Sequence, residues 1–306
     1  MTKPGLEPNF ANMGVANFDS FFQGEARDFL LWNIRLALAE DGADLTGRAI
    51  FVPEHRSEAV IVAKQDSLLA GLPIVPITLA EAEAYEAGEW SWEPLALEGS
   101  SVKNRDQVAR IEGNTRLLLK AERVILNYIM QLSGVANLTA LYARELEGAG
   151  SRLLDTRKTC PGLRYPQKYA VRVGGGLNHR LGLDKMLLLK DNHIDAAGSV
   201  SRAVEMARRC APDGLGLEVE CRSLDEVREA VALKVDRLML DNMDKQTLSR
   251  AMELIPPGIE TEVSGGVGLE NISALAGLKP RAPDFISVGR LTHSAPAADF
   301  SLCFIK

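Results

Sequence analysis

The spacing of apolar positions changes near residue 150 of this 306-residue chain, and the change predicts two domains. After that point, short apolar runs alternate with amphipathic helical patterns in units of about 20 to 35 residues. Such alternation is typical of a parallel α/β structure, and a barrel is its natural closure. The predicted strands are 152–156, 186–190, 216–220, 237–241, 259–264 and 284–289, and the predicted helices are 200–211, 224–234, 245–254 and 271–278.

The first half of the chain predicts a smaller α+β unit. Residues 1–24 look like an irregular arm, and an amphipathic helix is expected at 25–40. The apolar stripe of that helix is Phe29, Trp32, Leu36 and Ala39. Strands are expected at 59–64, near 89–93 and at 102–112.

A long helical pattern runs from 114 to 147 and contains the expected domain boundary. Ser133 and Gly134 interrupt its apolar stripe, because glycine is a poor helix former. The pattern therefore predicts two consecutive helices that break at this pair.

Composition excludes several classes of protein. The net charge of −6 argues against a nucleic-acid-binding protein, whose surface is usually basic. No apolar run reaches the roughly 20 residues that span a bilayer, and the first residues lack the apolar core of a secretion signal. The four cysteines show no CxxC spacing or paired framework. We therefore expect a cytoplasmic protein that binds neither nucleic acid nor membranes.

Positive charge is concentrated between Thr156 and Lys190. This window holds a single acid, Asp184, and eight cationic side chains: Arg157, Lys158, Arg164, Lys168, Arg172, Arg180, Lys185 and Lys190. A concentrated positive field in an acidic protein favours an anionic partner. The tight clustering predicts a pocket for a small polyanion.

Polar groups follow nearly every apolar run of the second half, and the carboxyl ends of barrel strands meet at one mouth. Loops are exposed to solvent, so a charged residue at the end of one strand needs no functional explanation. Six such strand ends in succession, with different polar groups, favour a functional site. Arginine suits carboxylates and lysine suits phosphate, which assigns an anion to Arg157, Lys158, His179, Arg180 and Lys190. Glu220 and Asp241 suit Mg²⁺ or ribose hydroxyls. Glycine turns at Ser264-Gly265-Gly266 and at Gly289 suit phosphate, because they expose backbone N–H groups.

Other motifs in the sequence give weaker evidence of function. Asn192 and His193 are expected to orient neighbours, since no second histidine lies at metal-ligand spacing. Cys160 has no assigned general base, so a covalent nucleophile is not indicated. The three glycines at 174–176 are not a dinucleotide-binding fingerprint that follows a strand.

Several long segments resemble quinolinate phosphoribosyltransferases, in the same order and over nearly the whole chain. They are DTRKT-PGLR, KYAVRVGGG-NHR, LLLKDNHI, EVEC, LMLDNM, EVSGGV and ISVGRLTHSA, with AERVILNYIMQLSGVANLT upstream. The resemblance implies an incomplete (β/α) barrel domain at 131–292 and a smaller N-terminal α+β sandwich domain at 1–130. The tail at about 293–306 would pack back on the N-terminal domain.

The resemblance also implies a reaction: quinolinate and phosphoribosyl pyrophosphate, with Mg²⁺, give nicotinate mononucleotide, pyrophosphate and CO₂ in NAD biosynthesis. Quinolinate-binding residues of the family match Arg157, His179 and Arg180, with Arg123 supplied by the second subunit of a homodimer. Lys158 and Lys190 match lysines that contact carboxylate and phosphate groups. Glu220 and Asp241 match the acids that hold ribose and metal, directly or through water. The phosphate loops match Ser264, Gly265, Gly266 and Gly289.

The sequence departs from the family pattern at three positions. Cys160 stands where the family usually has threonine, and Val263 stands where it has a small residue before Ser264. Arg290 replaces a small residue after Gly289. Three alternative interpretations remain open. A related transferase of molybdate uptake would use another acceptor, which the complete basic set disfavours. A non-catalytic anion sensor would not need Glu220 and Asp241. A sugar-phosphate isomerase or lyase would want a lysine in an apolar pocket, whereas Lys158 and Lys190 lie among polar groups.

Overall fold

The computed structural model describes residues 17–212 and 214–305, and its contacts divide the chain into two compact units. The N-terminal unit holds the described residues up to Leu138, Pro161–Gly175 and those from Ala295 onward, and the C-terminal unit holds Thr139–Cys160 and Gly176–Ser294. Most of the predicted arm lies outside the described residues, and its described end forms the short helix α1 (Phe18–Phe21).

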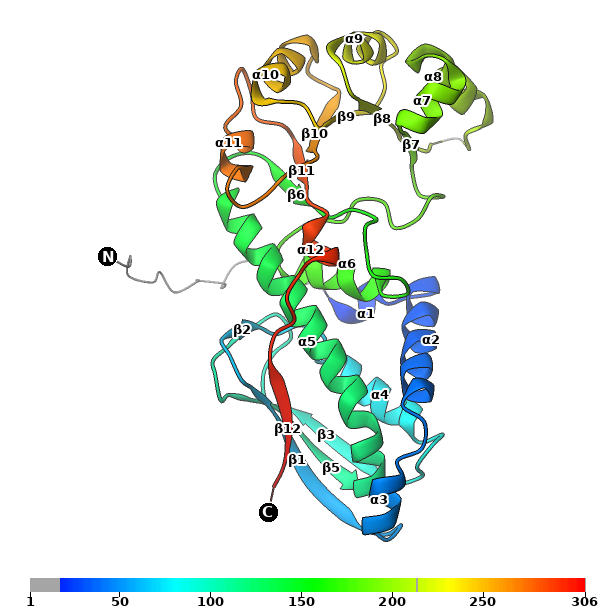
Figure 1. Cartoon of the computed structure of the whole chain (residues 1–306), viewed down its shortest axis with the longest axis vertical. Coiled ribbons are helices and arrows are strands. Elements are labelled where there is room, and N and C mark those ends of the chain that lie inside the picture. Colours follow the sequence, from blue (N-terminus) through cyan, green and yellow to red (C-terminus); the bar gives the residue numbers. More distant parts are fainter. Residues whose placement is uncertain (1–16, 213, 306) are drawn as a thin grey trace, which may run out of the picture. The chain divides into compact units, whose positions relative to one another are not determined.

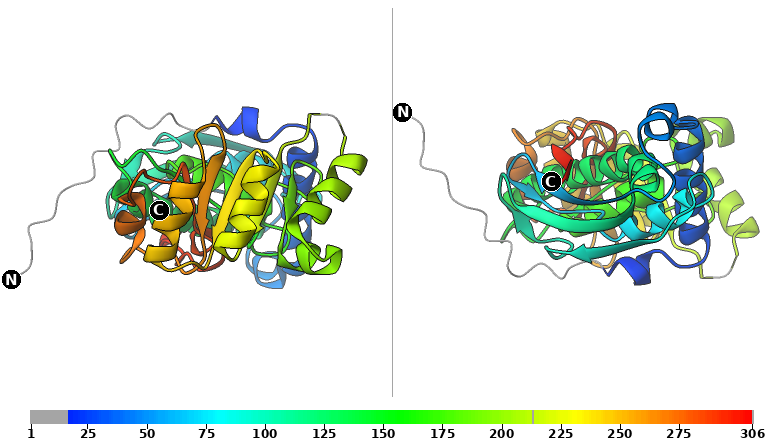
Figure 2. Two further views of the ribbon diagram at one scale, coloured as in Figure 1. Left: turned by 90° about the horizontal axis from the view of Figure 1, so that it is seen from above. Right: turned by 90° about the horizontal axis from the view of Figure 1, so that it is seen from below.

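An antiparallel sheet in the order β12-β1-β5-β3 forms the centre of the N-terminal unit, and helix α5 lies along one face of it (Figures 1 and 2). Its strands are β1 (Arg56–Ala63), β3 (Trp90–Pro94), β5 (Gln107–Asn114) and β12 (Phe300–Phe304). The C-terminal strand β12 pairs with β1, so that Ile61 lies between Leu302 and Ala109. The helices are α2 (Glu25–Glu40), α3 (Leu45–Ile50), α4 (Ile74–Ala82) and α6 (Arg164–Val173).

The single strand predicted at 102–112 is wrong, because the chain turns within it. Residues Ser101–Val102 form β4, which pairs with β2 (Ser67–Leu68), whereas β5 begins at Gln107. Asp106 makes the turn, since its carboxylate accepts the backbone N–H of Lys103 at 2.8 Å. An aspartate that bonds a nearby backbone group in this way stabilises a turn against a continuous strand.

Helix α2 has the predicted bounds but buries a different face. Ala26, Leu30, Ile34 and Leu38 are its buried residues. The predicted stripe instead faces solvent, with Trp32 58% and Leu36 68% exposed. The helix is apolar on two faces, so its sequence alone did not determine which one packs against α4 and α6.

Helix α5 (Thr115–Glu145) is continuous, so the predicted break at Ser133 and Gly134 is wrong. Both residues are small because other segments approach the helix there. The Ser133 hydroxyl accepts the backbone N–H of Ala70 at 3.0 Å, and a Cβ on Gly134 would lie 2.1 Å from the Pro296 carbonyl oxygen. Close approach of this kind excludes any side chain. The exact residue of the domain boundary stays a prediction, since α5 continues from one unit into the other.

Among the described helices, α5 alone is long and apolar enough to cross a membrane by length and composition. However, 67% of its most apolar 18-residue window is buried within the structure. The core helix of a globular protein has the same composition.

The C-terminal unit contains a parallel sheet in the order β6-β11-β10-β9-β8-β7, which confirms the predicted parallel α/β fold. The strands are β6 (Arg152–Leu154), β7 (Leu187–Leu189), β8 (Leu217–Cys221), β9 (Arg237–Asp241), β10 (Glu260–Ser264) and β11 (Phe285–Ser287). Strands β6 and β7 form its two edges, so among the described residues the sheet is an open barrel. The helices are α7 (Asp191–Ala197), α8 (Val200–Cys210), α9 (Leu224–Ala232), α10 (Lys245–Leu254), α11 (Ile272–Ala276) and α12 (Arg290–His293). Helices α8, α9 and α10 lie side by side (Figure 2, left).

The two faces of this sheet differ in chemistry. Side chains alternate along a strand, so every second residue shares a face. In β8, Leu217, Val219 and Cys221 belong to the apolar core that also includes side chains of α8–α10, whereas Glu218 and Glu220 take the alternate positions. The same alternation in β9 and β10 places Leu238, Leu240 and Val263 in the core. The opposite face is therefore available for polar residues.

Candidate functional site

A cavity of about 550 Å³ opens on the polar face of the C-terminal unit. Ten residues predicted for the site line it: Arg157, Lys158, His179, Arg180, Lys190, Glu220, Asp241, Ser264, Gly265 and Gly266. The remaining loop residue, Gly289, lines an adjoining cavity of about 250 Å³ that shares Lys158 and Ser264. Arg123 lies on α5 in the N-terminal unit, where its side chain is exposed.

The basic wall of the larger cavity is built from two loops. Arg157 follows β6, and its Nε is buried with no hydrogen-bond partner among the described residues. Arg180 lies near it, and its Nη1 donates to the Met186 carbonyl at 2.8 Å. Burial, followed by the charge of Arg157, lowers the pKa of Arg180. Two guanidinium groups held together and partly desolvated are a favourable environment for a carboxylate or phosphate.

Lys190 begins helix α7 directly after β7, and its ammonium lies 3.0 Å from Glu220 Oε2. The backbone N–H of Lys190 donates to His193 Nδ1 at 2.9 Å, so His193 orients Lys190 as predicted. Asp241 ends β9, and its Oδ2 accepts the side-chain amide of Asn242 at 2.7 Å. The cavity thus places carboxylates beside cations, an arrangement suited to a substrate with both hydroxyl and anionic groups.

The smaller cavity is bounded by backbone. Ser264, Gly265 and Gly266 follow β10, and Gly289 follows β11. A Cβ on Gly289 would lie 3.1 Å from Lys158 Cδ and 3.3 Å from His293 Nε2. Gly289 therefore leaves the room through which the Lys158 side chain passes between the two cavities. Backbone N–H groups together with a lysine suit a phosphate group.

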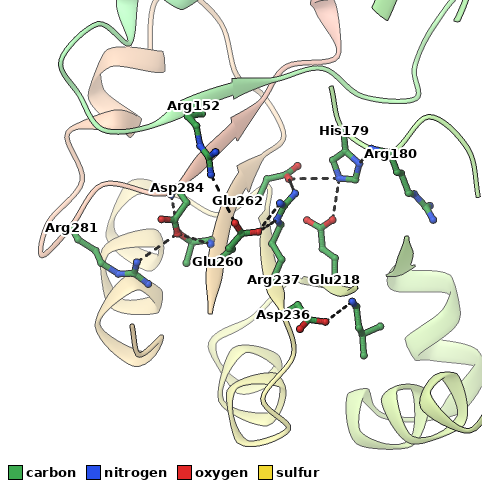
Figure 3. A network of polar contacts seen from close by, with 12 residues as sticks. Arg152, His179, Arg180, Glu218, Asp236, Arg237, Glu260, Glu262, Arg281 and Asp284 are labelled. Carbon is green, nitrogen blue, oxygen red and sulfur yellow. Dashed lines mark hydrogen bonds and ion pairs between the residues drawn. The ribbon is translucent and has the colours of Figure 1, made fainter. Parts of the chain in front are cut away.

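Two further acids, Glu262 and Glu218, line this face, and the sequence assigned neither of them a role. Both are fully buried on the polar face, on β10 and β8, and they lie against His179 (Figure 3). Burial raises the pKa of Glu218 to about 7, and burial together with the charge of Glu218 raises the pKa of Glu262 to about 8. The signal was present, since Glu218 and Glu262 each precede a predicted site residue by two positions and so share its face.

The sequence assigned no site role to Ser287 and His293, and it marked Arg290 only as a departure from the family pattern. Each lines the smaller cavity with Gly289. Ser287 precedes Gly289 by two positions, whereas His293 reaches the cavity only because α12 turns the chain back. Of the three departures noted in the sequence, Arg290 is the one that lines a cavity, and Val263 belongs to the apolar core.

An open parallel barrel with a mixed basic and acidic cavity defines an α/β-barrel enzyme that acts on anionic substrates. Comparison with known proteins narrows this class. The family model described as quinolinate phosphoribosyl transferase, C-terminal domain, matches residues 135–303, and the model of the N-terminal domain matches residues 44–133. The chain belongs to the quinolinate phosphoribosyltransferase family.

Individual relatives agree with this assignment. A protein of Synechocystis named probable nicotinate-nucleotide pyrophosphorylase (carboxylating) is 42% identical over 258 residues, which cover 83% of this chain and 84% of that protein. A relative of the same name from Bacillus subtilis is 39% identical over 261 residues, which cover 85% of this chain and 87% of that protein. The solved nicotinate-nucleotide pyrophosphorylase of Francisella tularensis is 34% identical, with a TM-score of 0.84, and covers 94% of this chain and 100% of that one.

Proposed function

We propose that this protein transfers the phosphoribosyl group of phosphoribosyl pyrophosphate to quinolinate, with release of pyrophosphate and CO₂, in the de novo synthesis of NAD. The product is nicotinate mononucleotide. The observation that carries this proposal is the single cavity in which Arg157, Arg180 and Lys190 face carboxylates and the Ser264 loop. Such a cavity matches a dicarboxylate next to a sugar phosphate in size and charge.

The arginines are assigned to the quinolinate carboxylates. Arg157 has an unsatisfied buried Nε, and Arg180 has a pKa lowered by burial and by its neighbour. An anion between them relieves both the missing hydrogen bond and the repulsion. His179 lines the same wall, and the prediction that it contacts quinolinate stays a prediction.

Lys158 and the two glycine loops are assigned to the phosphoribosyl group. The Lys158 side chain passes Gly289 and lines both cavities. The 5-phosphate would occupy the smaller cavity against Ser264, Gly265 and Gly266, and the pyrophosphate would face Lys158 and Lys190. Charge placed in this way lowers the barrier to departure of pyrophosphate.

Glu220 and Asp241 are assigned to the ribose hydroxyls and to Mg²⁺. Their carboxylate oxygens are hard donors on adjacent strands of one cavity, which suits this ion. Mg²⁺, when bound, would neutralise the pyrophosphate of the substrate. The carboxylates themselves stabilise the positive charge that develops on the sugar as the bond to pyrophosphate breaks.

Decarboxylation completes the reaction. The C2–carboxylate bond of the pyridine breaks, the electron pair stays on C2 beside the positively charged ring nitrogen, and C2 takes a proton from solvent. Arg157 and Arg180 would hold the ring in place during this step, so the protein contributes mainly position and electrostatics. No covalent intermediate with the protein is needed.

We further propose a homodimer in which Arg123 reaches the active site of the second subunit. Arg123 is exposed on α5, and the second apolar face of α2 exposes Trp32 and Leu36 one turn apart. Exposed apolar faces of this kind are typical of interfaces. A cytoplasmic location agrees with four free cysteine thiols, as expected in a reducing compartment.

The test is turnover of purified protein with quinolinate, phosphoribosyl pyrophosphate and Mg²⁺, followed by release of CO₂ and formation of nicotinate mononucleotide. We expect both products in equal amounts, and no turnover when Mg²⁺ is chelated. Turnover of another base with none of quinolinate would overturn the proposal.

A further inference from the structure

His179 is held on its backbone side by Asp155. The Asp155 Oδ1 accepts the backbone N–H of His179 at 2.9 Å, and its Oδ2 accepts the side-chain amide of Asn178 at 2.7 Å. Asp155 is fully buried and directly follows β6, which keeps the histidine backbone fixed at the cavity wall. The ring itself is only 5% exposed, so its two nitrogens must be satisfied largely by protein groups.

Both ring nitrogens meet specific groups. The backbone N–H of Arg180 donates to His179 Nδ1 at 2.7 Å. A nitrogen that accepts a hydrogen bond carries no proton, so the ring is the tautomer with its proton on Nε2. Nε2 lies 3.1 Å from Glu218 Oε2 and 3.6 Å from Glu262 Oε2, so this side of the ring faces two carboxyl groups at close range, although neither contact has hydrogen-bond geometry (Figure 3).

Arg237 contacts Glu262 from the other side. Its Nη1 lies 3.5 Å from Glu262 Oε2, its Nη2 lies 2.7 Å from the outer Glu260, and its guanidinium stacks on Phe285 at 4.2 Å. Glu262 is therefore held between Arg237 and His179, and Glu218 approaches the same ring from β8. The contacts form one continuous chain from the surface to the wall of the cavity.

We propose that Glu218 and Glu262 are positioning residues: they fix the His179 tautomer, and His179 in turn fixes Arg180 for the quinolinate carboxylate. Arg180 is then anchored at two points, by its backbone N–H on His179 and by its Nη1 on the Met186 carbonyl. This role rests on the proposed function. In this role His179 is an uncharged support for Arg180. The positive charge that binds the anion belongs to the Arg180 guanidinium.

The same three side chains could also suggest a metal site, because their ligand atoms lie within 4.8 Å of one another. The contact at Nδ1 argues against this. A histidine can ligate a metal only through an unprotonated nitrogen, and here the unprotonated Nδ1 is occupied by the Arg180 backbone. We therefore assign the cluster to positioning of the His179 ring.

Two double variants of the full-length enzyme separate positioning from charge. Glu218→Gln with Glu262→Gln, and Glu218→Leu with Glu262→Leu, remove the same two ionisable groups, but only glutamine keeps polar oxygen atoms beside Nε2. Relative to the glutamine pair, we expect the leucine pair to raise the KM for quinolinate about tenfold, with the KM for phosphoribosyl pyrophosphate nearly unchanged. Equal KM values for quinolinate in the two double variants would overturn the inference. Glu205→Gln is the control and should leave both KM values unchanged, because Glu205 pairs with Arg209 on the surface of α8, outside this network.

The tautomer gives a test that does not depend on activity. The ring nitrogens of His179 can be assigned by NMR with a His179→Gln variant, because the chain has only four histidines. We expect a proton on Nε2 and none on Nδ1 in the parent and the glutamine pair, with a mixture in the leucine pair. A proton on Nδ1 in the parent, or a shift of the His179 signals on addition of Zn²⁺ alone, would overturn the inference. If the leucine pair does not fold, the spectra of the parent and the glutamine pair still show which ring nitrogen of His179 carries the proton. Absence of turnover with quinolinate in the parent would instead count against the proposed function.

Discussion

Lys190 Nζ lies 3.0 Å from Glu220 Oε2, so an ion pair joins the residue after β7 to the neighbouring strand β8 inside the cavity. The lysine is 44% exposed along its side chain and the glutamate only 9%. The glutamate is thus fixed, and the lysine can exchange its partner for an incoming pyrophosphate without leaving the site. This pair leads to the first prediction.

Lys190→Ala should lower kcat/KM by about 100-fold, because it removes a positioned charge from the leaving group. Glu220→Gln should also lower it, and the double variant should lose less than the two single losses combined, since paired residues couple. Steady-state kinetics with both substrates measure the coupling. Lys185→Ala is the control, since Lys185 pairs with Asp184 at 2.9 Å on the surface of the same basic window. An equal loss in this control would argue for a general effect of charge.

Gly289→Ala should raise the KM for phosphoribosyl pyrophosphate about tenfold and leave that for quinolinate nearly unchanged. The new methyl group would lie 3.1 Å from Lys158 Cδ, so the lysine side chain must shift within the cavity that holds the phosphate. The control is Gly216→Ala, whose Cβ meets only Met186 Cγ at 3.8 Å. If both KM values rise together, the smaller cavity does not bind the phosphoribosyl group separately.

Arg123→Ala and Lys190→Ala should each be nearly inactive alone and should regain activity when mixed. In a shared-site dimer, a mixed pair has one site with both defects and one intact site. Statistical exchange should therefore restore about a quarter of the parental activity. Exchange must be verified with differently tagged subunits, and no recovery after verified exchange would remove the role of Arg123 across the interface.

The pH dependence of stability should respond to Glu98, which is buried in the N-terminal unit. Its carboxylate accepts the backbone N–H groups of Gly71 and Leu72 at 2.7 and 2.9 Å and the hydroxyl of Tyr169 at 2.9 Å. Burial nevertheless raises the pKa of Glu98 from 4.5 to about 7. The folded state then binds the proton more tightly than the unfolded state, so this stability is fully present below pH 4.5 and is lost as pH rises through about 7.

Glu98→Gln should flatten that dependence, because the amide does not ionise. The difference between parent and variant should change by on the order of 3 kcal/mol across this pH range. Urea unfolding at several pH values measures it. A parental stability that rises between pH 5 and 8 while the variant stays flat would show that the hydrogen bonds, and not burial, dominate the pKa.

Much of the fold followed from local pattern. Apolar runs and helical spacing predicted β9 and α10 to the residue, because each strand of a parallel sheet is continuous and each helix has a polar face. Predictions failed where two segments far apart in sequence meet. The sequence predicts a helix break at Gly134, but the glycine is needed because the Pro296 carbonyl lies against the helix there. The sequence also predicts that Trp32 is buried, but Leu30 and Ile34 are the buried residues of this helix.

By itself, the sequence determined the parallel α/β class, the strand ends that carry charge and the family to which the chain belongs. These depend on local spacing and on residue types, which a linear chain records directly. Only the tertiary structure decided which carboxylates face inward together. Glu218 and Glu262 come from different strands, and nothing along the chain indicates that they meet at one histidine ring. That contact depends on the order of the strands and on the loop that carries His179, which are set by long-range packing.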